Sequence, residues 1–140
     1  MIKLIVYGEP VAQGRPRATT VNGRVRMYDP KKSRDFKHYL KLAASKHRPE
    51  QLIEGPISLE VKVYKPILKS FSKKKKAAAE AGQLRPISKP DVSNYLKLIE
   101  DALTGVIWKD DSQIIDCSIS KYYSETPRTE IQIKEMDVIE

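Results

Sequence analysis

Four short segments of this chain place an apolar residue at every second position, and they restrict the possible folds more than any other feature. The segments are residues 2–7, 56–64, 115–120 and 131–134. A period of two predicts strands with one buried face, because successive side chains point to opposite sides of a sheet. Four such strands must bury their apolar face against other elements, so the intervening segments decide the fold class.

Two intervening segments show the three- and four-residue spacing of amphipathic helices. The first spans residues 30–47 and the second about 92–104. A shorter, exposed helix is predicted between Ser72, a start residue, and Gly82, a stop residue. In the second long helix the apolar residues form one stripe, namely Tyr95, Leu96, Ile99, Ala102 and Leu103.

This order of segments predicts an α+β fold with two layers, a small four-stranded mixed sheet and helices on one of its faces. The 140 residues suit one domain, spanning 1–140. Residues 11–30 hold two glycines and two prolines, which indicates a loop or a loose hairpin. A homodimer would help so small a sheet to cover its apolar surface.

Composition argues against a membrane protein and a disulfide-bonded scaffold. No apolar run approaches the roughly 20 residues of a membrane helix, and the amino terminus lacks the pattern of a signal peptide. The single cysteine, Cys117, allows no internal disulfide, which favours the cytoplasm. Cys117 alternates with isoleucines, so we expect a small core residue there.

The charge of the chain favours a polyanionic partner. Lys and Arg number 26 against 18 Asp and Glu, a formal net charge of +8, and such an excess suits nucleic acid. Guanidinium and ammonium groups in a mobile loop and a lysine run can contact phosphates. The alternative is that they are merely solvated. The candidates are Arg15, Arg17, Lys73, Lys74, Lys75, Lys76 and Lys89.

Acidic residues nevertheless gather around the second long helix. Asp91 precedes it, Asp101 lies on it, and Asp110 and Asp111 follow it. If the next strand packs beside the helix, these carboxylates can converge on one point. Clustered carboxylates repel one another unless a cation compensates them, and hard oxygen ligands select Mg²⁺ or Mn²⁺. Such a metal can activate water for attack on a phosphodiester.

Each of these acids also has a purely structural interpretation. Asp91 can cap the helix, Asp101 can pair with Lys97 four residues earlier, and Asp110 with Asp111 can form an ordinary turn. Residue chemistry by itself favours these interpretations, because helix caps and acidic turns are common. Trp108, between the helix and the acidic pair, is predicted to be a packing anchor for the turn.

The whole segment 89–113 nevertheless resembles the signature of the RusA family of Holliday junction resolvases. The family shows K-P/R-D-x-D-N, a lysine one turn later, D-A-L, a glycine, an aromatic residue and D-D-x-Q. The amino-terminal GEPVAQGRPR and the following YDPKKSRDF resemble the family more loosely. The matching residues are Lys89, Pro90, Asp91, Asn94, Lys97, Asp101, Ala102, Leu103, Gly105, Trp108, Asp110, Asp111 and Gln113.

The resemblance implies a dimeric endonuclease, dependent on Mg²⁺ with Mn²⁺ as a substitute, that nicks two opposing strands of a four-way DNA junction. It implies that Asp91 and Asp111 are metal-binding catalytic carboxylates and that Lys97 is a basic catalytic residue near the scissile phosphate. Asp101 and Asp110 are expected in or beside the metal site.

One position departs from the family pattern, because Ser93 stands where the family has a second aspartate. A serine hydroxyl is a neutral and weaker ligand, so the site loses a negative charge. Asp101 or Asp110 can replace it, Ser93 can bind through water, or the protein can bind junctions and cut poorly. We favour replacement by Asp101.

Three other functions remain alternatives to a junction resolvase. The first is a non-catalytic DNA junction-binding protein. The second is a metal-dependent nuclease for RNA or for other branched DNA, and the third is a basic structural protein. The preferred cleavage sequence cannot be read from the chain.

Overall fold

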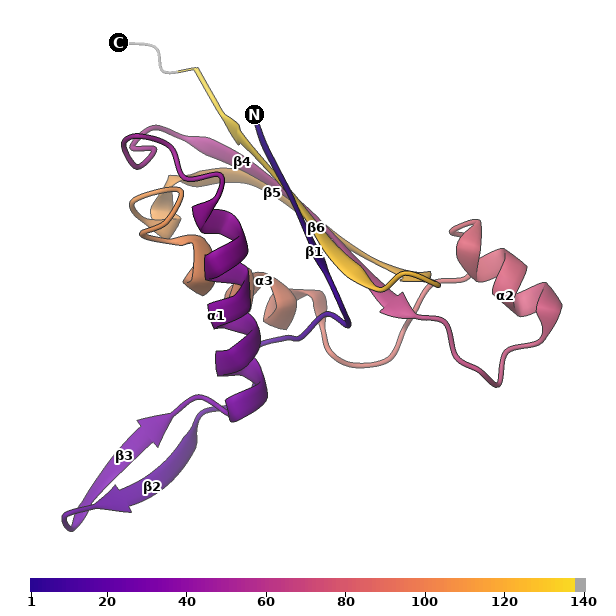
Figure 1. Cartoon of the computed structure of the whole chain (residues 1–140), viewed down its shortest axis with the longest axis horizontal. Helices are drawn as coiled ribbons and strands as arrows, with labels where there is room; N and C mark the ends of the chain where they lie inside the picture. The colour runs from indigo at the N-terminus through magenta and orange to yellow at the C-terminus, as the bar shows by residue number, and fades with distance from the viewer. Residues whose placement is uncertain (138–140) are drawn as a thin grey trace.

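A computed structural model describes residues 1–137, and its centre is a four-stranded mixed sheet (Figure 1). The strands lie in the order β1 (Ile2–Tyr7), β6 (Arg128–Glu135), β4 (Ile57–Pro66) and β5 (Ile114–Ser124). β6 pairs antiparallel with both β1 and β4, whereas β4 and β5 are parallel. The parallel pair requires a crossover between β4 and β5. That crossover contains α3 (Val92–Leu103), the helix around which the acidic residues gather.

Two helices, α1 (Lys31–Ser45) and α3 (Val92–Leu103), pack against each other and cover one face of the sheet (Figure 1). The alternating residues of β4 point into this core, and the apolar stripe of α3 meets them. The predicted α+β fold, with a small mixed sheet and helices on one face, is therefore confirmed. The largest buried side chains include Trp108, Tyr95, Leu40, Leu59, Leu98, Ile99 and Ile131.

The stretch predicted to be a loop or a loose hairpin is a two-stranded antiparallel ribbon. It consists of β2 (Arg17–Val21) and β3 (Arg24–Tyr28), and every residue of both strands is exposed. Asn22 and Gly23 connect the strands with positive φ values of 52° and 74°, as a tight hairpin turn requires. The ribbon projects from the body of the molecule near the start of α1 (Figure 1).

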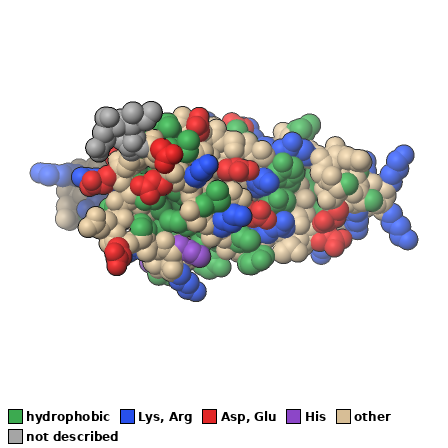
Figure 2. Space-filling model, turned by 90° about the horizontal axis from the view of Figure 1, so that it is seen from above, with side chains coloured by type: hydrophobic (Ala, Val, Ile, Leu, Met, Phe, Trp, Pro, Cys, Tyr) green, Lys and Arg blue, Asp and Glu red, His purple; other side chains and the backbone are tan. Residues whose placement is uncertain are grey.

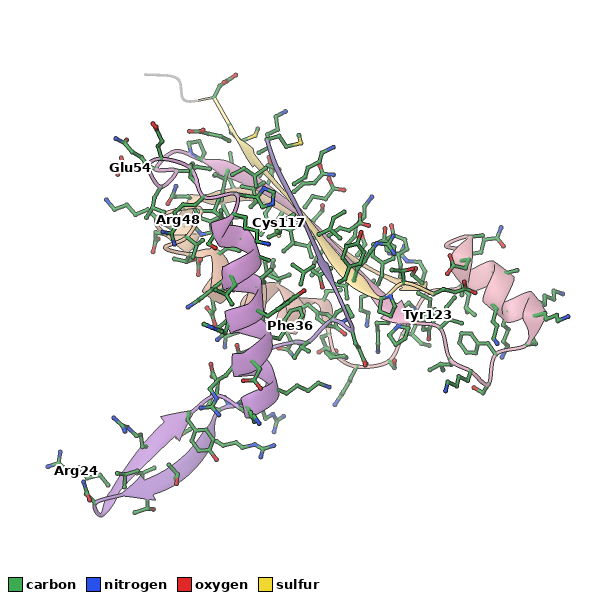
Figure 3. All side chains as sticks on the ribbon, viewed as in Figure 1. Arg24, Phe36, Arg48, Glu54, Cys117 and Tyr123 are labelled. Carbon is green, nitrogen blue, oxygen red and sulfur yellow. The ribbon has the colours of Figure 1, made fainter. Side chains whose placement is uncertain are left out.

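The lysine run lies at the opposite end of the molecule, in the short helix α2 (Lys73–Glu80) (Figure 1). The Ser72 side chain caps this helix by accepting a hydrogen bond from the backbone N–H of Lys75, at 3.2 Å. α2 packs against β5, and Phe71 makes an edge-on contact with Tyr123 of that strand. Tyr123 lies at the end of the sheet that is nearer to α2 (Figure 3). The hydrogen bond of the Ser72 side chain confirms Ser72 as the predicted start residue of the helix.

The prediction that Cys117 belongs to the core is wrong. The register pairs Cys117 with Leu59, which places it on the helix-covered face of the sheet. β5 is an edge strand, however, and the helices leave this part of the edge uncovered, so the thiol is exposed. Ile115 on the same strand is 58% exposed. Within residues 1–137, no helix has the length and apolar character needed to cross a membrane.

Candidate functional site

Asp91 occupies the N-cap position of α3, yet its side chain caps nothing. The backbone carbonyl of Asp91 accepts hydrogen bonds from the N–H groups of Asn94, at 3.1 Å, and Tyr95, at 3.3 Å. The carboxylate makes no capping hydrogen bond and is exposed. Capping therefore does not account for Asp91, whose carboxylate is free to bind a cation or a hydrogen-bond donor.

Two lysines that the sequence analysis missed hold the segment that leads into Asp91. Lys121 Nζ donates hydrogen bonds to the backbone carbonyl oxygens of residues 88 and 90, at 2.9 and 3.1 Å. Lys65 Nζ donates a hydrogen bond to the backbone carbonyl oxygen of residue 89, at 3.0 Å. Burial and the nearby charge of Lys121 lower the pKa of Lys65. The two ammonium groups thus fix the backbone from which the Asp91 carboxylate projects.

Asp111 lies at the other end of α3, in the 3₁₀ turn η1 (Asp111–Gln113). Its carboxylate accepts hydrogen bonds from the Thr104 hydroxyl and, at 3.4 Å, from the indole Nε1 of Trp108. Trp108 is fully buried, which confirms the predicted packing anchor. The indole also donates to Thr104 Oγ1, at 3.0 Å. Asp111 is therefore tied to the last turn of α3.

Asp110, in contrast, takes part in the local turn. Its side chain accepts hydrogen bonds from the hydroxyl and the N–H of Ser112, and these bonds lower the pKa of Asp110. The Gln113 side chain accepts from the N–H groups of Lys109 and Asp110, and it donates to the carbonyl of Ile53 at 2.7 Å. The structural interpretation as a turn thus accounts for Asp110 and Gln113.

Asp101 faces α1. Its carboxylate lies 3.6 Å from Lys37 Nζ, and Lys37 also pairs with Asp29, at 2.9 Å. The structural interpretation that paired Asp101 with Lys97 is not met, because Lys97 makes no ion pair within residues 1–137. Asp101 is also eight positions from Ser93, or about 12 Å along the helix axis, so this geometry does not place it where the missing family aspartate would be.

The structure does not bring the four predicted metal ligands together within one chain. Asp91 and Asp111 flank the 12 residues of α3, which separates them by about 18 Å along the axis. Among the described residues, no three His, Cys, Asp or Glu side chains are grouped so as to hold a metal ion. One chain therefore does not fit a Mg²⁺ centre built from these residues, and their metal-binding roles stay predictions.

The sequence analysis overlooked Glu100, because it considered only aspartates. Glu100 is half-buried, and burial together with the negative charges of Asp111 and Asp101 raises its pKa. The sequence signal for Glu100 was its spacing from other polar residues on the same face of α3. Ser93, Lys97, Glu100 and Thr104 follow one another at four, three and four residues, so they fall within about 60° on the helix. We call these four residues the α3 stripe, and it faces away from the core.

Basic residues gather in a cavity of about 590 Å³ that ends at Lys89 and Pro90, next to Asp91. Residues 9–17, the start of α1 and the end of β4 form its other walls. Of the predicted phosphate-binding residues, Arg15, Arg17 and Lys89 meet here, whereas the lysines at positions 73–76 lie on α2 at the far end. Figure 2 shows blue side chains at that end. The charged lining residues are Arg15, Arg17, Lys32, Lys65, Lys89 and Glu9.

Gly14 holds this arginine loop against α1. Its N–H donates to Ser33 Oγ at 2.9 Å, and Ser33 is buried. A Cβ at position 14 would lie 2.9 Å from Pro30 Cγ, closer than carbon atoms tolerate. A residue without a side chain is therefore needed for the loop to approach α1 and to present Arg15 and Arg17 to the cavity.

Comparison with known proteins places these features in a wider group. Residues 7–134 match the family model described as "Endodeoxyribonuclease RusA". The chain is 59% identical over 137 residues to "Uncharacterized protein YqaN" of Bacillus subtilis (strain 168), a match that covers 96% of each chain. It is 27% identical over 128 residues to "Crossover junction endodeoxyribonuclease rusA" of Lactococcus phage r1t, which covers 91% of each chain.

Proposed function

Because the chain belongs to the RusA family of endodeoxyribonucleases, we propose that it binds four-way DNA junctions and hydrolyses a phosphodiester bond in two opposing strands. The observation that supports this most directly is the free, exposed carboxylate of Asp91 beside a cavity lined by five cations. Recombination and repair of DNA are the processes that need this reaction, and we propose a cytoplasmic location for it.

The cationic cavity is proposed to bind the backbone of the strand that is cut. Arg15 and Arg17 offer guanidinium groups that match phosphate oxygens bidentately, and Lys89 adds a charge directly before Asp91. Lys97 is exposed on the α3 stripe and makes no ion pair among residues 1–137, so its ammonium group is available to a phosphate. Phosphate contacts of this kind hold and orient DNA without reading its sequence.

Mg²⁺, with Mn²⁺ as a substitute, is proposed as the cofactor on the basis of the family resemblance. In such enzymes the metal activates a water and neutralises charge on the phosphate. Asp91 and Asp111 remain the proposed ligands, although one chain holds them at opposite ends of α3.

A non-catalytic junction-binding protein is the second candidate, and Ser93 is the observation that favours it. Ser93 is exposed and neutral at the position of a family aspartate, so one chain offers fewer anionic ligands than the family pattern. This protein would bind junctions in the same cationic cavity but would leave them uncut in any metal. A nuclease for other branched DNA would cut flaps or forks as fast as four-way junctions.

The decisive experiment compares cleavage of a synthetic four-way junction and a linear duplex of matched sequence, with Mg²⁺, Mn²⁺ or EDTA. We expect paired nicks in the junction only, abolished by EDTA and by Asp111→Asn. Asp35→Asn is the matched control, because Asp35 is an exposed aspartate on α1. Tight junction binding without nicks in either metal would instead support the binding protein.

A further inference from the structure

We propose that Lys37, held between Asp29 and Asp101, is a positioning residue. It fixes the direction in which the ribbon β2–β3 leaves the body, and the preference for branched over linear DNA depends on that direction. The effect on DNA rests on the proposed function, whereas the mechanical role of Lys37 does not. The starting observation is that Asp101, one of the four predicted metal ligands, forms an ion pair with a lysine of another helix.

The ribbon owes its direction to its root, which we define as residues 13–14 and 29. Every residue of β2 and β3 is exposed, so no side chain of the ribbon is buried against the body. The ribbon projects near the start of α1 (Figure 1), and Arg24 lies at its far tip (Figure 3). A two-stranded ribbon is marginally stable by itself. The contacts of the root therefore decide where Arg17, Arg24 and Arg26 are placed.

One carboxylate joins the two ends of the ribbon. Asp29 directly follows β3, and Gln13 lies before β2 at the other end. Gln13 Nε2 donates a hydrogen bond to Asp29 Oδ1, at 3.1 Å, and Lys37 Nζ donates to Oδ2, at 2.9 Å. The hydrogen bond from Lys37 is the main cause that lowers the pKa of Asp29. Asp29 thus connects both ends of the ribbon to α1.

Lys37 extends this connection to α3. Its ammonium group lies 3.6 Å from Asp101 Oδ2, and its side chain is only 16% exposed. Lys37 is on the second turn of α1 and Asp101 is on the last turn of α3. Without the ammonium group, Asp29 and Asp101 would lose their shared counter-charge. Because both carboxylates are partly exposed, we expect this loss to loosen the root without unfolding the domain.

A second connection joins the root to the start of α3. The N–H of Gln13 donates to the backbone carbonyl of Asn94, at 3.0 Å, and the N–H of Asn94 donates to the carbonyl of Asp91, at 3.1 Å. Gly14 and Ser33 hold the next residue of the root against α1. The root, α1 and the Asp91 end of α3 therefore form one connected body. The direction of the ribbon and the position of the carboxylate are set together.

The ribbon and the cationic cavity together form a surface for phosphates. The cavity reaches from Arg17, the first residue of β2, to Pro90, which precedes Asp91. The ribbon adds positive charge, since no acidic residue occurs from position 10 to position 28. Phosphates can therefore contact the ribbon and the cavity at the same time, and such contacts orient DNA. The angle between these two surfaces decides which shapes of DNA contact both.

A branched substrate gains most from a fixed angle. The arms of branched DNA diverge from one point, whereas a linear duplex is stiff and nearly straight over the length of a small protein. Two linked contacts strengthen binding only when the geometry allows both to form at once. A ribbon held at the angle between two arms therefore raises the affinity for branched DNA, and a ribbon free to turn loses that advantage. Lys37 contributes the part of this preference that depends on a rigid root.

This role gives a reason for Asp101 that differs from metal binding. A metal ion at the Asp101 carboxylate would have to displace the ammonium group of Lys37, because two cations beside one carboxylate repel each other. The positioning role instead uses the ion pair as the structure has it. The two roles predict opposite results for metal affinity, so they can be separated by experiment.

Spin labels test the mechanical role in the absence of DNA. Labels are attached through Arg24→Cys at the tip and Ser118→Cys on β5, in a Cys117→Ser background, and labelled protein is diluted with unlabelled protein. Pulsed electron paramagnetic resonance then gives the distribution of distances between the labels. We expect Lys37→Met to broaden this distribution about twofold or more. Lys41→Met, at an exposed lysine of α1, is the matched control and should resemble the wild type.

Variants of Asp101 separate positioning from metal binding. Asp101→Asn should broaden the same distribution, and Asp101→Glu should restore most of it, because glutamate keeps the charge that holds Lys37. Titration calorimetry should give Asp101→Asn the Mn²⁺ affinity of the wild type. Weaker Mn²⁺ binding with an unchanged distribution would make Asp101 a metal ligand and overturn the proposal. Equal distributions in the wild type and in Lys37→Met would overturn it as well.

Competition binding in EDTA tests the effect on DNA without any cleavage. A four-way junction and a linear duplex of the same sequence compete for the protein. We expect Lys37→Met and Asp101→Asn to reduce the preference for the junction by about fivefold or more, through weaker junction binding. Lys41→Met controls for the loss of one positive charge. Circular dichroism melting should give similar midpoints for all variants.

The outcomes distinguish this inference from the proposed function. A preference for the junction that persists in Lys37→Met, although the distance distribution is broadened, would overturn the effect on selectivity. A wild-type protein without any preference for the junction would remove the proposed function, and the spin labels would still decide the mechanical role. Loss of nuclease activity alone affects neither measurement, because both are made without cleavage.

Discussion

At the scale of single residues, the site is defined by which polar groups are already bonded within the chain. Asp110 is bonded to Ser112, and Asp101 is paired with Lys37. Asp91 has no capping bond, and Asp111 is held by Thr104 and Trp108 while remaining exposed. Burial and hydrogen bonding thus distinguish four aspartates that look equivalent in the sequence.

Lys121 is predicted to position Asp91 from beneath. Lys121→Met removes two hydrogen bonds to the backbone of residues 88–90, so that Asp91 is held less accurately. Small misplacements of catalytic groups reduce rates strongly, and we expect single-turnover cleavage to fall by about tenfold or more. Junction affinity should change little, and Lys121→Arg should restore part of the rate. An equal decrease in affinity and rate would indicate that Lys121 binds a phosphate instead.

Ser93→Asp is predicted to strengthen metal binding, because it restores the carboxylate of the family pattern. Titration calorimetry with Mn²⁺ on the DNA-free protein should show tighter binding than in the wild type. Ser118→Asp, on the exposed edge strand β5, controls for added charge alone. Identical Mn²⁺ affinities in the wild type and the Ser93→Asp variant would show that position 93 lies outside the metal site.

At the scale of elements, the two basic extensions lie at opposite ends of the molecule (Figure 1). The ribbon β2–β3 borders the cationic cavity, whereas α2 is attached through its packing against β5. Their separation suits binding to different parts of a large branched substrate. The cavity lies next to Asp91 and is bordered by the ribbon. The ribbon end is therefore the better candidate to bind the DNA strand that is cut.

Replacement of the four lysines at positions 73–76 by glutamine tests whether α2 binds DNA. If these lysines bind phosphates, the slope of log affinity against log salt should fall by about 0.9 for each phosphate that is no longer neutralised. The Ser72 cap remains, so the helix should persist in circular dichroism. Lys41→Gln with Lys46→Gln, on and just after α1, is the control. An unchanged slope would mean that the lysine run is simply a solvated helix face.

At the scale of the whole molecule, the uncovered edge of the sheet and the outward α3 stripe are on adjacent surfaces. Ile115 and Cys117 are exposed there, and Glu100 lacks a bonded partner among residues 1–137. A small sheet with one incompletely covered edge gains apolar burial when two copies meet. Stability and assembly are therefore expected to be coupled in this protein.

This coupling predicts a thermal midpoint that rises with protein concentration, because association stabilises the folded state by mass action. The wild type should show the rise in scanning calorimetry over a hundredfold concentration range. A midpoint independent of concentration in the wild type would argue for a monomer.

The sequence by itself determined the strands of the main sheet, the helices and the positions of the four candidate aspartates along them. Periods of two and of three to four placed the four strands of the main sheet, α1 and α3, because burial of one face imposes these periods directly. The ribbon β2–β3 buries neither face, so no such period announced its strands. Ser72, Asp91 and Trp108 were also found at their predicted boundaries and turns. These properties depend on neighbours along the chain, so a linear pattern contains them.

Only the tertiary structure decided which of these residues meet. The length of α3 keeps Asp91 and Asp111 apart. The packing of α1 against α3 brings Lys37 close enough to form an ion pair with Asp101. The edge position of β5 exposes Cys117, although its alternation with isoleucines matches a core strand. Lys65 and Lys121 reach the Asp91 loop from strands distant in sequence. Contacts of this kind depend on strand order and helix packing, which no local period encodes.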